Sequence, residues 1–445
     1  MASDKGYWIS SGTYTFLTRI ATVLFGFGTF FFLVRLLTEA DFGAFSLFLT
    51  TTSLIEVARN GLIQNAQIKF TATATPEEYP KILKASLILN IFLSVLSIII
   101  LYLIAPYLAK IWDSPEMEQM LKIYCITIVV LIPFTQFNFL QQANLDFKGV
   151  FYTTMLRQGL FFGVIITYHL IFRPFNLIEL AWWQVFSSGI ASLLSFYFVR
   201  NYWVSSKGIP WEWVKKLFHF GKYVFGTNLS AMIFQSIDQF MIGKYLGPAP
   251  AGLFNVSMRV TNLVDVPIST VVSVVFPQSS KFQGENQKQN MKDMFEKSTG
   301  FMLALILPAC FVTLLFPELI ITIVAGKNYA VEGANLLRVT ILSIMVQPFL
   351  RQFGTMLDSS GKPEINFYAL LGMAIINVIL NVVFIQQFDI MGAAYGTLTS
   401  MAIFAVLARF ILKSNFDISF IASIKYIFVF YGKAFIYIKN LGTSK

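Results

Sequence analysis

The stretch IDQFMIGKYLGPAPAGLFNVSMRVTNLVD, residues 237–265, decides the fold of this chain. It reads as the end of one apolar helix, a tight Gly/Pro turn and the first half of a second apolar helix. A similar stretch, GTFFFLVRLLTEADFGAFSLFLTTTSLIE, occupies residues 28–56, which is 209 residues earlier. The matched pairs are Arg35 with Lys244, Leu37 with Leu246, Ala40 with Ala249, Gly43 with Gly252, Phe45 with Phe254 and Glu56 with Asp265. Two similar halves in one apolar chain are typical of transporters whose substrate site lies between the halves.

The composition indicates a membrane protein. Hydrophobic residues make up 56% of the 445 residues and charged residues only 13%, whereas soluble domains carry about 25% charged residues. Apolar runs of about 20 residues recur along the chain, and each is long enough to span a bilayer core of about 30 Å. The sequence therefore predicts an all-α polytopic membrane protein.

The apolar runs predict about twelve spans in two six-helix halves. Their approximate bounds are 9–34, 42–63, 80–105, 119–142, 149–172, 178–200, 218–246, 252–276, 298–324, 334–358, 364–386 and 392–412. A basic linker with three tryptophans, residues 201–217, separates the halves 1–200 and 218–412. Six helices per half predict a pseudo-two-fold axis along the membrane normal. The basic tail, residues 413–445, is either an interfacial helix or a thirteenth span.

Lysines and arginines concentrate in alternate loops, on the side of both termini. The positive-inside rule therefore places both termini in the cytoplasm. This bias also accounts for the net charge of +10, so no nucleic-acid partner is predicted. The two cysteines lie within apolar runs, and we interpret them as core residues and not as metal ligands.

Charges within the predicted spans mark candidate sites, because a charge at the centre of a membrane helix costs about 2.5–3.5 kcal/mol on insertion scales. The basic candidates for substrate binding are Arg19, Arg59, Arg157, Arg259 and Arg351. The acidic candidates for ion coupling are Glu56, Asp238 and Asp265. The excess of arginine predicts a cationic interior that suits an anionic substrate, since guanidinium binds phosphate in bidentate fashion.

Structural interpretations of these charges remain open. Glu56 and Arg59 are three residues apart and could form an ion pair within one helix, or Arg59 could snorkel to the interface. Asp265 could neutralise Arg19 or Arg259. The amides of span 4 and of span 11, Asn377 and Asn381 among them, could line a wet path for sugars or join helices.

Prolines interrupt several spans, and Pro133, Pro267 and Pro348 are the hinge candidates. A proline removes a backbone donor and kinks a helix. Pro133 and Pro348 fall in the fourth spans of the two halves. Each proline is either a hinge that opens and closes the cavity or a static kink.

Four segments resemble one family of transporters. They are FLVRLLTEADFGAFSLF (32–48), IDQFMIGKYLGPAPAGLFNVSMRV (237–260), VVFPQSSKF (274–282) and DSSGKPEINFYALLGMAIINVILNVVFIQQFDIMGAAYGTLTS (358–400). The chain resembles the polysaccharide transporters and O-antigen flippases of the multidrug/oligosaccharidyl-lipid/polysaccharide superfamily. The resemblance implies a MATE-like fold in the bacterial inner membrane. It also implies that the chain moves undecaprenyl-pyrophosphate-linked sugar units for O-antigen, capsule or exopolysaccharide.

The related lipid II flippase uses arginines in its first, second and eighth helices, and Arg19, Arg59 and Arg259 occupy those helices here. The resemblance also suggests the polysaccharide polymerase and glycosyltransferases as partners, besides the lipid-linked substrate and membrane lipids. No enzyme motif is present in the sequence, and no cofactor is predicted beyond H⁺ or Na⁺ as a coupling ion. The alternatives are an ion-coupled multidrug antiporter of the same fold and a non-transporting scaffold for glycan assembly.

Overall fold

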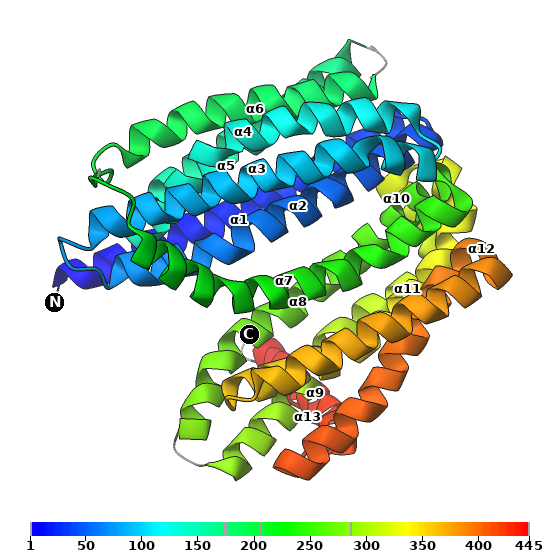
Figure 1. Cartoon of the computed structure of the whole chain (residues 1–445). Helices are drawn as coiled ribbons and strands as arrows, with labels where there is room; N and C mark the ends of the chain where they lie inside the picture. Colours follow the sequence, from blue (N-terminus) through cyan, green and yellow to red (C-terminus); the bar gives the residue numbers. More distant parts are fainter. Residues whose placement is uncertain (1, 172–175, 205, 285–286, 444–445) are drawn as a thin grey trace. The chain divides into compact units, whose positions relative to one another are not determined.

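Helices form all the regular structure of the described residues, which are 2–171, 176–204, 206–284 and 287–443 in the computed structural model (Figure 1). Eight helical segments in this part of the chain are long and apolar enough to cross a membrane. The longest of them, Glu364–Phe416, is long enough for two crossings. These findings confirm the prediction of an all-α polytopic membrane protein.

The chain divides into two compact units. Unit 1 comprises Met1–Ser236 and Gly247–Gly252, and unit 2 comprises Ile237–Leu246 and Leu253–Lys445. The helices are α1 (Ala2–Leu36), α2 (Glu39–Ala72), α3 (Tyr79–Ile111), α4 (Pro115–Ala143), α5 (Phe147–Leu170), α6 (Leu177–Val199), α7 (Trp211–Leu246), α8 (Pro248–Gly284), α9 (Lys288–Leu315), α10 (Pro317–Ala325), η1 (Lys327–Tyr329), α11 (Ala330–Ser359), α12 (Pro363–Phe416) and α13 (Phe420–Thr443). The boundary between the units falls within α7 and again just after the start of α8. The division into halves at residues 201–217 stays a prediction.

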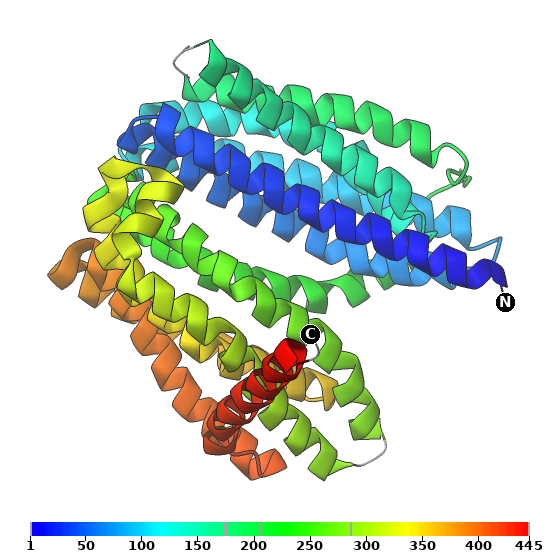
Figure 2. The ribbon, with the colours of Figure 1, turned by 180° about the vertical axis from the view of Figure 1, so that it is seen from behind.

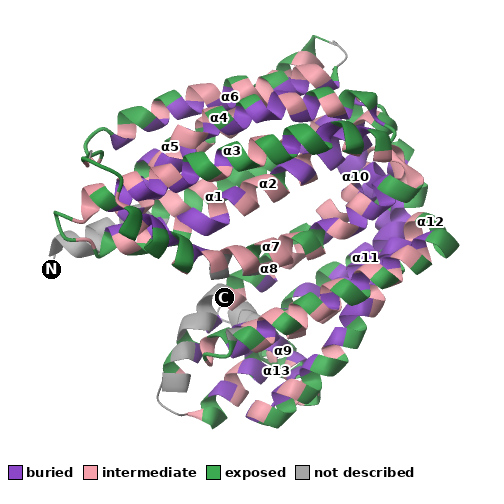
Figure 3. Cartoon of the chain, in the orientation of Figure 1, coloured by how far each residue is buried: buried purple, intermediate pink, exposed green. Residues whose placement is uncertain are grey.

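Helix α4 lies at the centre of unit 1. It packs against α2, α3, α5 and α6, while α1 packs against α5. Of the eight membrane-length segments, α4 is the most buried, and Figure 3 shows the buried positions along it. Because α4 is surrounded by other helices, polar side chains on it can be satisfied away from lipid.

The open face of α3 is apolar, as expected for a helix in lipid. Its exposed large side chains are Ile91, Phe92, Val95, Leu96, Ile99, Ile100, Tyr102, Leu103, Ile104 and Tyr107. A contiguous apolar surface of this size is rare on a soluble monomer. The opposite face of α3 buries polar side chains such as Ser86 and Asn90.

Unit 2 has its core between α8, α9, α11 and α13, around Ile268, Met302, Ile341 and Ile427. Helix α12 packs against α11 and breaks at Asp389, where φ is 51° and ψ is −136°. The break lies between the two predicted spans 364–386 and 392–412. Span 9, by contrast, begins and ends earlier than predicted. α9 ends at Leu315 and Pro317 opens the separate helix α10, because proline suits a first helical turn but not a helix interior.

The proposed repeat has similar turns in its two copies. In the first copy α1 ends at Leu36 and α2 begins at Glu39, with the Thr38 hydroxyl accepting a hydrogen bond from the Asp41 backbone N–H at 3.1 Å. In the second copy α7 ends at Leu246 and α8 begins at Pro248. Gly247 between them has φ of +90°, which favours glycine.

The C-terminal tail forms α13, which packs against α9 (Figure 2). The Tyr431 hydroxyl donates to the Ala304 carbonyl at 2.9 Å, and the Glu296 carboxylate accepts from the Ser419 backbone N–H at 3.0 Å just before α13. Before the helix, Lys292 donates to Asp417 at 2.7 Å, and this hydrogen bond lowers the pKa of the Asp417 carboxyl below its ordinary value. The tail is therefore anchored to unit 2 through α9.

All three hinge candidates lie inside helices. Pro133 is in α4 and Pro348 is in α11, and Pro267 is in α8. Their role as hinges stays a prediction.

Candidate functional site

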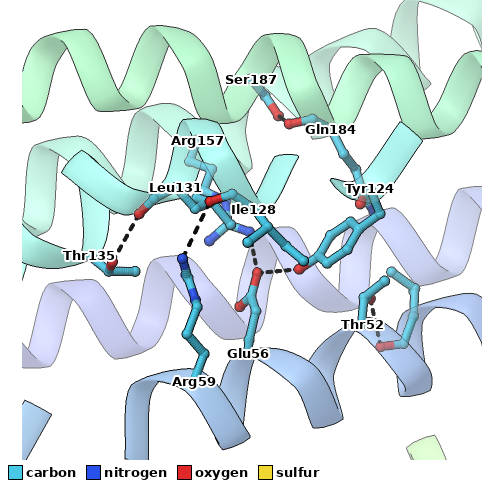
Figure 4. Close-up of polar contacts among 11 residues, drawn as sticks. Thr52, Glu56, Arg59, Tyr124, Ile128, Leu131, Thr135, Arg157, Gln184 and Ser187 are labelled. Atoms are coloured by element: carbon cyan, nitrogen blue, oxygen red, sulfur yellow. Dashed lines mark hydrogen bonds and ion pairs between the residues drawn. The ribbon is translucent and has the colours of Figure 1, made fainter. Parts of the chain in front are cut away.

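Unit 1 contains a charged cluster between α2, α4 and α5 (Figure 4). Glu56 on α2 accepts from the Arg157 guanidinium of α5 at 3.0 Å and from the Tyr124 hydroxyl of α4 at 2.7 Å. The same carboxylate oxygen takes both bonds. The side chains of Glu56 and Arg157 are each 29% exposed, so the described helices enclose the pair only in part.

Arg59 lies one helical turn beyond Glu56 and is buried, with 1% of its surface exposed. Its Nη1 donates to the Ser94 hydroxyl at 3.2 Å and to the Ile128 carbonyl at 3.4 Å. Within the described residues, its Nε and Nη2 have no hydrogen-bond acceptor. A buried guanidinium with two unused donors is costly, which makes it a natural place for a carboxylate or phosphate to bind.

This arrangement decides between the interpretations that the sequence left open. Glu56 forms its ion pair with Arg157, 101 residues away in sequence, and not with Arg59 three residues away. Arg59 is buried and does not snorkel to the interface. Asp265 pairs with Arg351 at 3.0 Å, a partner that the sequence did not suggest for it.

Two amides of α4, Gln136 and Asn138, join helices. The Asn90 amide nitrogen on α3 donates to the Thr135 hydroxyl at 3.2 Å and to the Gln136 side-chain carbonyl at 3.3 Å. The Thr153 hydroxyl of α5 donates to the Asn138 side chain at 3.1 Å. These residues are buried, so their bonds fix α3 and α5 on α4.

A second buried acid lies in unit 2. Asp238 on α7 is 5% exposed and accepts hydrogen bonds from the Asn381 amide and the Thr397 hydroxyl. Asn377 donates to Thr397 at 3.2 Å and accepts from Asn381 at 3.3 Å. In the described part of the chain no basic side chain forms an ion pair with Asp238. Its negative charge is therefore met only by neutral groups.

The Asp238 cluster also has an unused acceptor. The side-chain carbonyl oxygen of Asn381 is buried and has no hydrogen-bond donor among the described residues. A Cβ at Gly396 would lie 2.3 Å from this oxygen, so glycine keeps the space around it open. Carboxylate, amide and hydroxyl oxygens together are a donor set that suits a hard cation.

The remaining candidates are more open. Arg19 on α1 is exposed, and Arg259 on α8 is half-buried. In the Asp265–Arg351 pair, the arginine side chain is 41% exposed and the carboxylate 17%. The five arginines thus occur in both units: Arg59 and Arg157 belong to one cluster in unit 1, whereas Arg259 and Arg351 belong to unit 2.

Two members of these clusters had no signal in the sequence. Tyr124 lies in the apolar run IYCITIVV, where an aromatic residue reads as lipid-facing or core. Thr397 lies in the small-residue run GAAYGTLTS, where a threonine reads as packing. Only the fold brings Tyr124 to Glu56 and Thr397 to Asp238.

Residues 32–332 match the model of a family described as polysaccharide biosynthesis protein. Among curated proteins, a probable low-salt glycan biosynthesis flippase of Haloferax volcanii, Agl15, is 28% identical over 46% of this chain and 43% of its own length. The teichuronic acid biosynthesis protein TuaB of Bacillus subtilis is 22% identical over 63% of this chain and 57% of its own length. The chain thus spans about half the length of these two relatives.

Solved structures show the fold. A multidrug resistance MATE family transporter of the MOP superfamily, in an inward-facing conformation, has a TM-score of 0.75 at 15% identity, covering 88% of this chain and 95% of its own. The lipid II flippase MurJ, in an inward closed conformation, also has a TM-score of 0.75, at 14% identity over 96% of this chain and 93% of its own. The fold is therefore that of MATE transporters and MurJ, as the sequence predicted.

Proposed function

The chain belongs to the polysaccharide biosynthesis protein family, and from this premise we propose that it is a flippase for lipid-linked oligosaccharides. Several of the proteins that it resembles are named as flippases or transporters, among them Agl15, a putative O-antigen transporter of Shigella flexneri and the lipid II flippase MurJ. The observation that carries the proposal is the cluster of Glu56, Arg157 and Arg59 in unit 1. It supplies two guanidiniums and one carboxylate, of which Arg157 and Glu56 are partly exposed and Arg59 is buried.

The pyrophosphate of the substrate binds this cluster by competing with Glu56. Among the acidic residues of the described chain, Glu56 is the one that forms an ion pair with Arg157. A phosphate that binds Arg157 therefore displaces the Glu56 carboxylate from it. Arg59, one turn along α2, offers two unused donors to the released carboxylate. The exchange pairs Glu56 with Arg59 and gives the pyrophosphate the Arg157 guanidinium, and so limits the cost of carrying an anion through the membrane.

The other arginines bind the pyrophosphate at other points of its path across the membrane. Arg19, Arg259 and Arg351 are exposed or half-buried on α1, α8 and α11 and are able to meet the pyrophosphate as the protein changes conformation. The sugars meet amides and aromatic rings, and the polyprenyl tail stays in lipid. Pro133, Pro267 and Pro348 supply the bending for alternating access. The protein works in the bacterial inner membrane with both termini in the cytoplasm, beside the polymerase and glycosyltransferases.

The coupling ion, H⁺ or Na⁺, binds at Asp238. The carboxylate is buried among neutral groups, and the Asn381 carbonyl oxygen beside it lacks a donor among the described residues. A Na⁺ ion at this place would compensate the charge and use the free oxygen. Glu56 and Asp265 are weaker candidates for coupling, because each already has an arginine partner.

The test is lipid flipping in liposomes with the purified full chain and a fluorescent undecaprenyl-pyrophosphate oligosaccharide. Arg157→Gln and Arg259→Ala should each slow flipping on the order of tenfold to a hundredfold, since each removes charged hydrogen bonds to phosphate. Arg338→Gln is the matched control, because Arg338 is exposed and bonds to Asn335 on its own helix. Equal rates in wild type and both variants would exclude the arginine site.

A second candidate function is an ion-coupled multidrug antiporter, which the acidic Asp238 cluster favours. This protein would extrude cationic drugs and would not move the fluorescent lipid under any ion gradient. Drug efflux that depends on Asp238 and not on Arg157 would select this alternative. Inactivity with both substrates would favour the scaffold.

A further inference from the structure

A second basic feature of unit 1 lies away from the Glu56 cluster, where α2 ends and α7 begins. Here a cavity of about 590 Å³ is lined by Phe70, Lys215, Lys216, His219 and Phe220. Phe70 comes from the last turn of α2, and the other four residues come from the first turns of α7. All five belong to unit 1. We call this cavity the α2–α7 pocket.

The walls of the α2–α7 pocket are aromatic and fixed. The Phe70 ring makes edge contacts with the Trp213 ring at 5.8 Å and with the Phe220 ring at 5.6 Å between centroids. These rings pack on a buried core that includes Leu62 of α2. A Cβ at Gly221 would lie 1.9 Å from the Leu62 carbonyl oxygen, so α7 is pressed directly on α2. The pocket is therefore a preformed feature of the fold.

Two cations contact these rings: Lys216, which lines the pocket, and Lys69, which lies beside it. The Lys216 ammonium lies 4.1 Å from the Trp213 ring centroid and 5.2 Å from that of Phe70. The Lys69 ammonium lies 4.3 Å from the Phe220 centroid. A ring face attracts an ammonium but does not neutralise its charge, so its N–H donors remain available to an anion.

The charge of the cluster is not compensated within the described residues. No carboxylate there forms an ion pair with Lys69, Lys215 or Lys216, and Glu212, one turn before Lys216 on α7, is not bonded to it. The ammonium groups of Lys69 and Lys216 lie 5.6 Å and 5.2 Å from the Phe70 ring centroid, so two like charges share one ring and repel each other unless an anion joins them. The pocket is therefore suited to bind a multivalent phosphate or a phosphate diester.

The surroundings place the pocket at the membrane interface. Trp211, at the start of α7, is 60% exposed, and Phe218 on the next turns is 45% exposed. Tryptophan is enriched at the level of lipid headgroups. A phosphate carried by a lipid suits this level, because its acyl chains can pack on the exposed apolar side chains while its headgroup meets the lysines.

We propose that the α2–α7 pocket binds the phosphate headgroup of a lipid in the adjacent leaflet, which the positive-inside rule makes the cytoplasmic one. Lys215, Lys216 and Lys69 bind the phosphate oxygens, and the rings of Phe70, Trp213 and Phe220 hold Lys216 and Lys69 in place. Anionic phospholipids and polyprenyl pyrophosphates share this chemistry. The site is separate from the Glu56 cluster and does not rest on the flippase activity.

The experiment measures lipid retention by the purified full chain in nanodiscs of phosphatidylcholine doped with a fluorescent lipid. The three probes are phosphatidylglycerol, undecaprenyl pyrophosphate and, in solution, inorganic pyrophosphate. Lys215→Gln/Lys216→Gln is the test variant. Lys81→Gln/Lys148→Gln is the matched control, because these lysines are exposed, lie in the same unit and on the same predicted side, and line no part of the pocket.

We expect the test variant to bind at least one of the two lipids about tenfold more weakly than wild type, and the control variant to change binding less than about twofold. The lipid with the larger loss identifies the source of the phosphate. Equal losses of lipid binding in the two variants would show an effect of general surface charge and overturn the proposal. Unchanged lipid binding in both variants would also overturn it. Tight binding of inorganic pyrophosphate that depends on the same lysines would overturn it as well.

Discussion

Gly43 and Gly252, which occupy equivalent positions in the two copies of the repeat, pack directly against each other. A Cβ at Gly252 would lie 2.9 Å from the Gly43 Cα and 3.0 Å from its backbone nitrogen. A Cβ at Gly43 would lie 1.8 Å from the Pro248 carbonyl oxygen. The start of α8 thus closes on the start of α2 with backbone against backbone, and both segments belong to unit 1. Small residues permit this approach between membrane helices.

Gly43→Ala should therefore destabilise the protein strongly. The new methyl group meets a backbone carbonyl that cannot rotate away, so we expect a loss of about 2–3 kcal/mol, at the upper end for overpacking. Thermal unfolding of the purified protein in detergent is the measurement. Gly163→Ala on α5 is the control, because no atom lies within 4 Å of the place that its new methyl group would take, and alanine favours helix by about 1 kcal/mol. Similar melting temperatures for both variants would contradict the close packing.

Arg59→Met should separate transport from stability. Arg59 is buried with two unused donors, and apolar side chains of similar volume often replace such charges without loss of stability. We expect an unchanged or higher melting temperature together with flipping slowed on the order of tenfold or more, because the released Glu56 then has no guanidinium to replace Arg157. A variant that melts earlier and still flips at the wild-type rate would assign Arg59 a structural role.

Asp238→Asn should remove the response to a cation. If Na⁺ binds beside Asp238, wild-type protein gains stability with rising Na⁺ concentration, by about 2.7 kcal/mol at a hundred times the dissociation constant. The variant keeps the size of the side chain and loses its charge, so the Na⁺-dependent shift in melting temperature should disappear. Asp265→Asn, which disrupts a pair with Arg351, is the control and should retain the shift. A shift that persists in Asp238→Asn would place the ion elsewhere.

Gly300→Ala should loosen α13 from α9. A Cβ at Gly300 would lie 2.5 Å from the Tyr426 Cβ and 2.6 Å from the Ser423 carbonyl oxygen. The tail must move to admit the methyl group, and trypsin should then cleave faster at the lysines of α13. Gly372→Ala on α12, where no atom lies within 4 Å, should be cleaved at the wild-type rate. Equal cleavage of the two variants would show that the tail tolerates the added volume.

The predicted orientation can be tested with single cysteines and an impermeant maleimide. The native Cys125 and Cys310 are buried, at 8% and 0% exposed, and should not react. Lys207→Cys, in the loop before α7, should be labelled only after cells are permeabilised, whereas Glu116→Cys at the start of α4 should be labelled in intact cells. Both native residues are exposed. The reverse pattern would invert the topology.

Much of the architecture could be predicted from the sequence because the signals for it are local. A run of about 20 apolar residues identifies a membrane helix wherever it packs, and the break of α12 at Asp389 lies between two such runs. Local patterns do not carry exact helix ends, and the predicted span 298–324 missed the break at Phe316. Residues with unusual chemistry in apolar runs, such as Arg59 and Asp238, were also found from sequence, because charge in a membrane helix is rare.

The tertiary structure alone decided which of these charges meet. Glu56 pairs with Arg157 on another helix and not with Arg59 on its own, and Asp265 pairs with Arg351. Asp238 accepts hydrogen bonds from Thr397 and Asn381 in place of any arginine of the described chain. Composition and hydropathy fix the residues that a span contains. The rotation of each helix about its axis, and the neighbours that it faces, depend on packing between side chains far apart in the sequence. Pairing of charges inside the membrane is set by that packing.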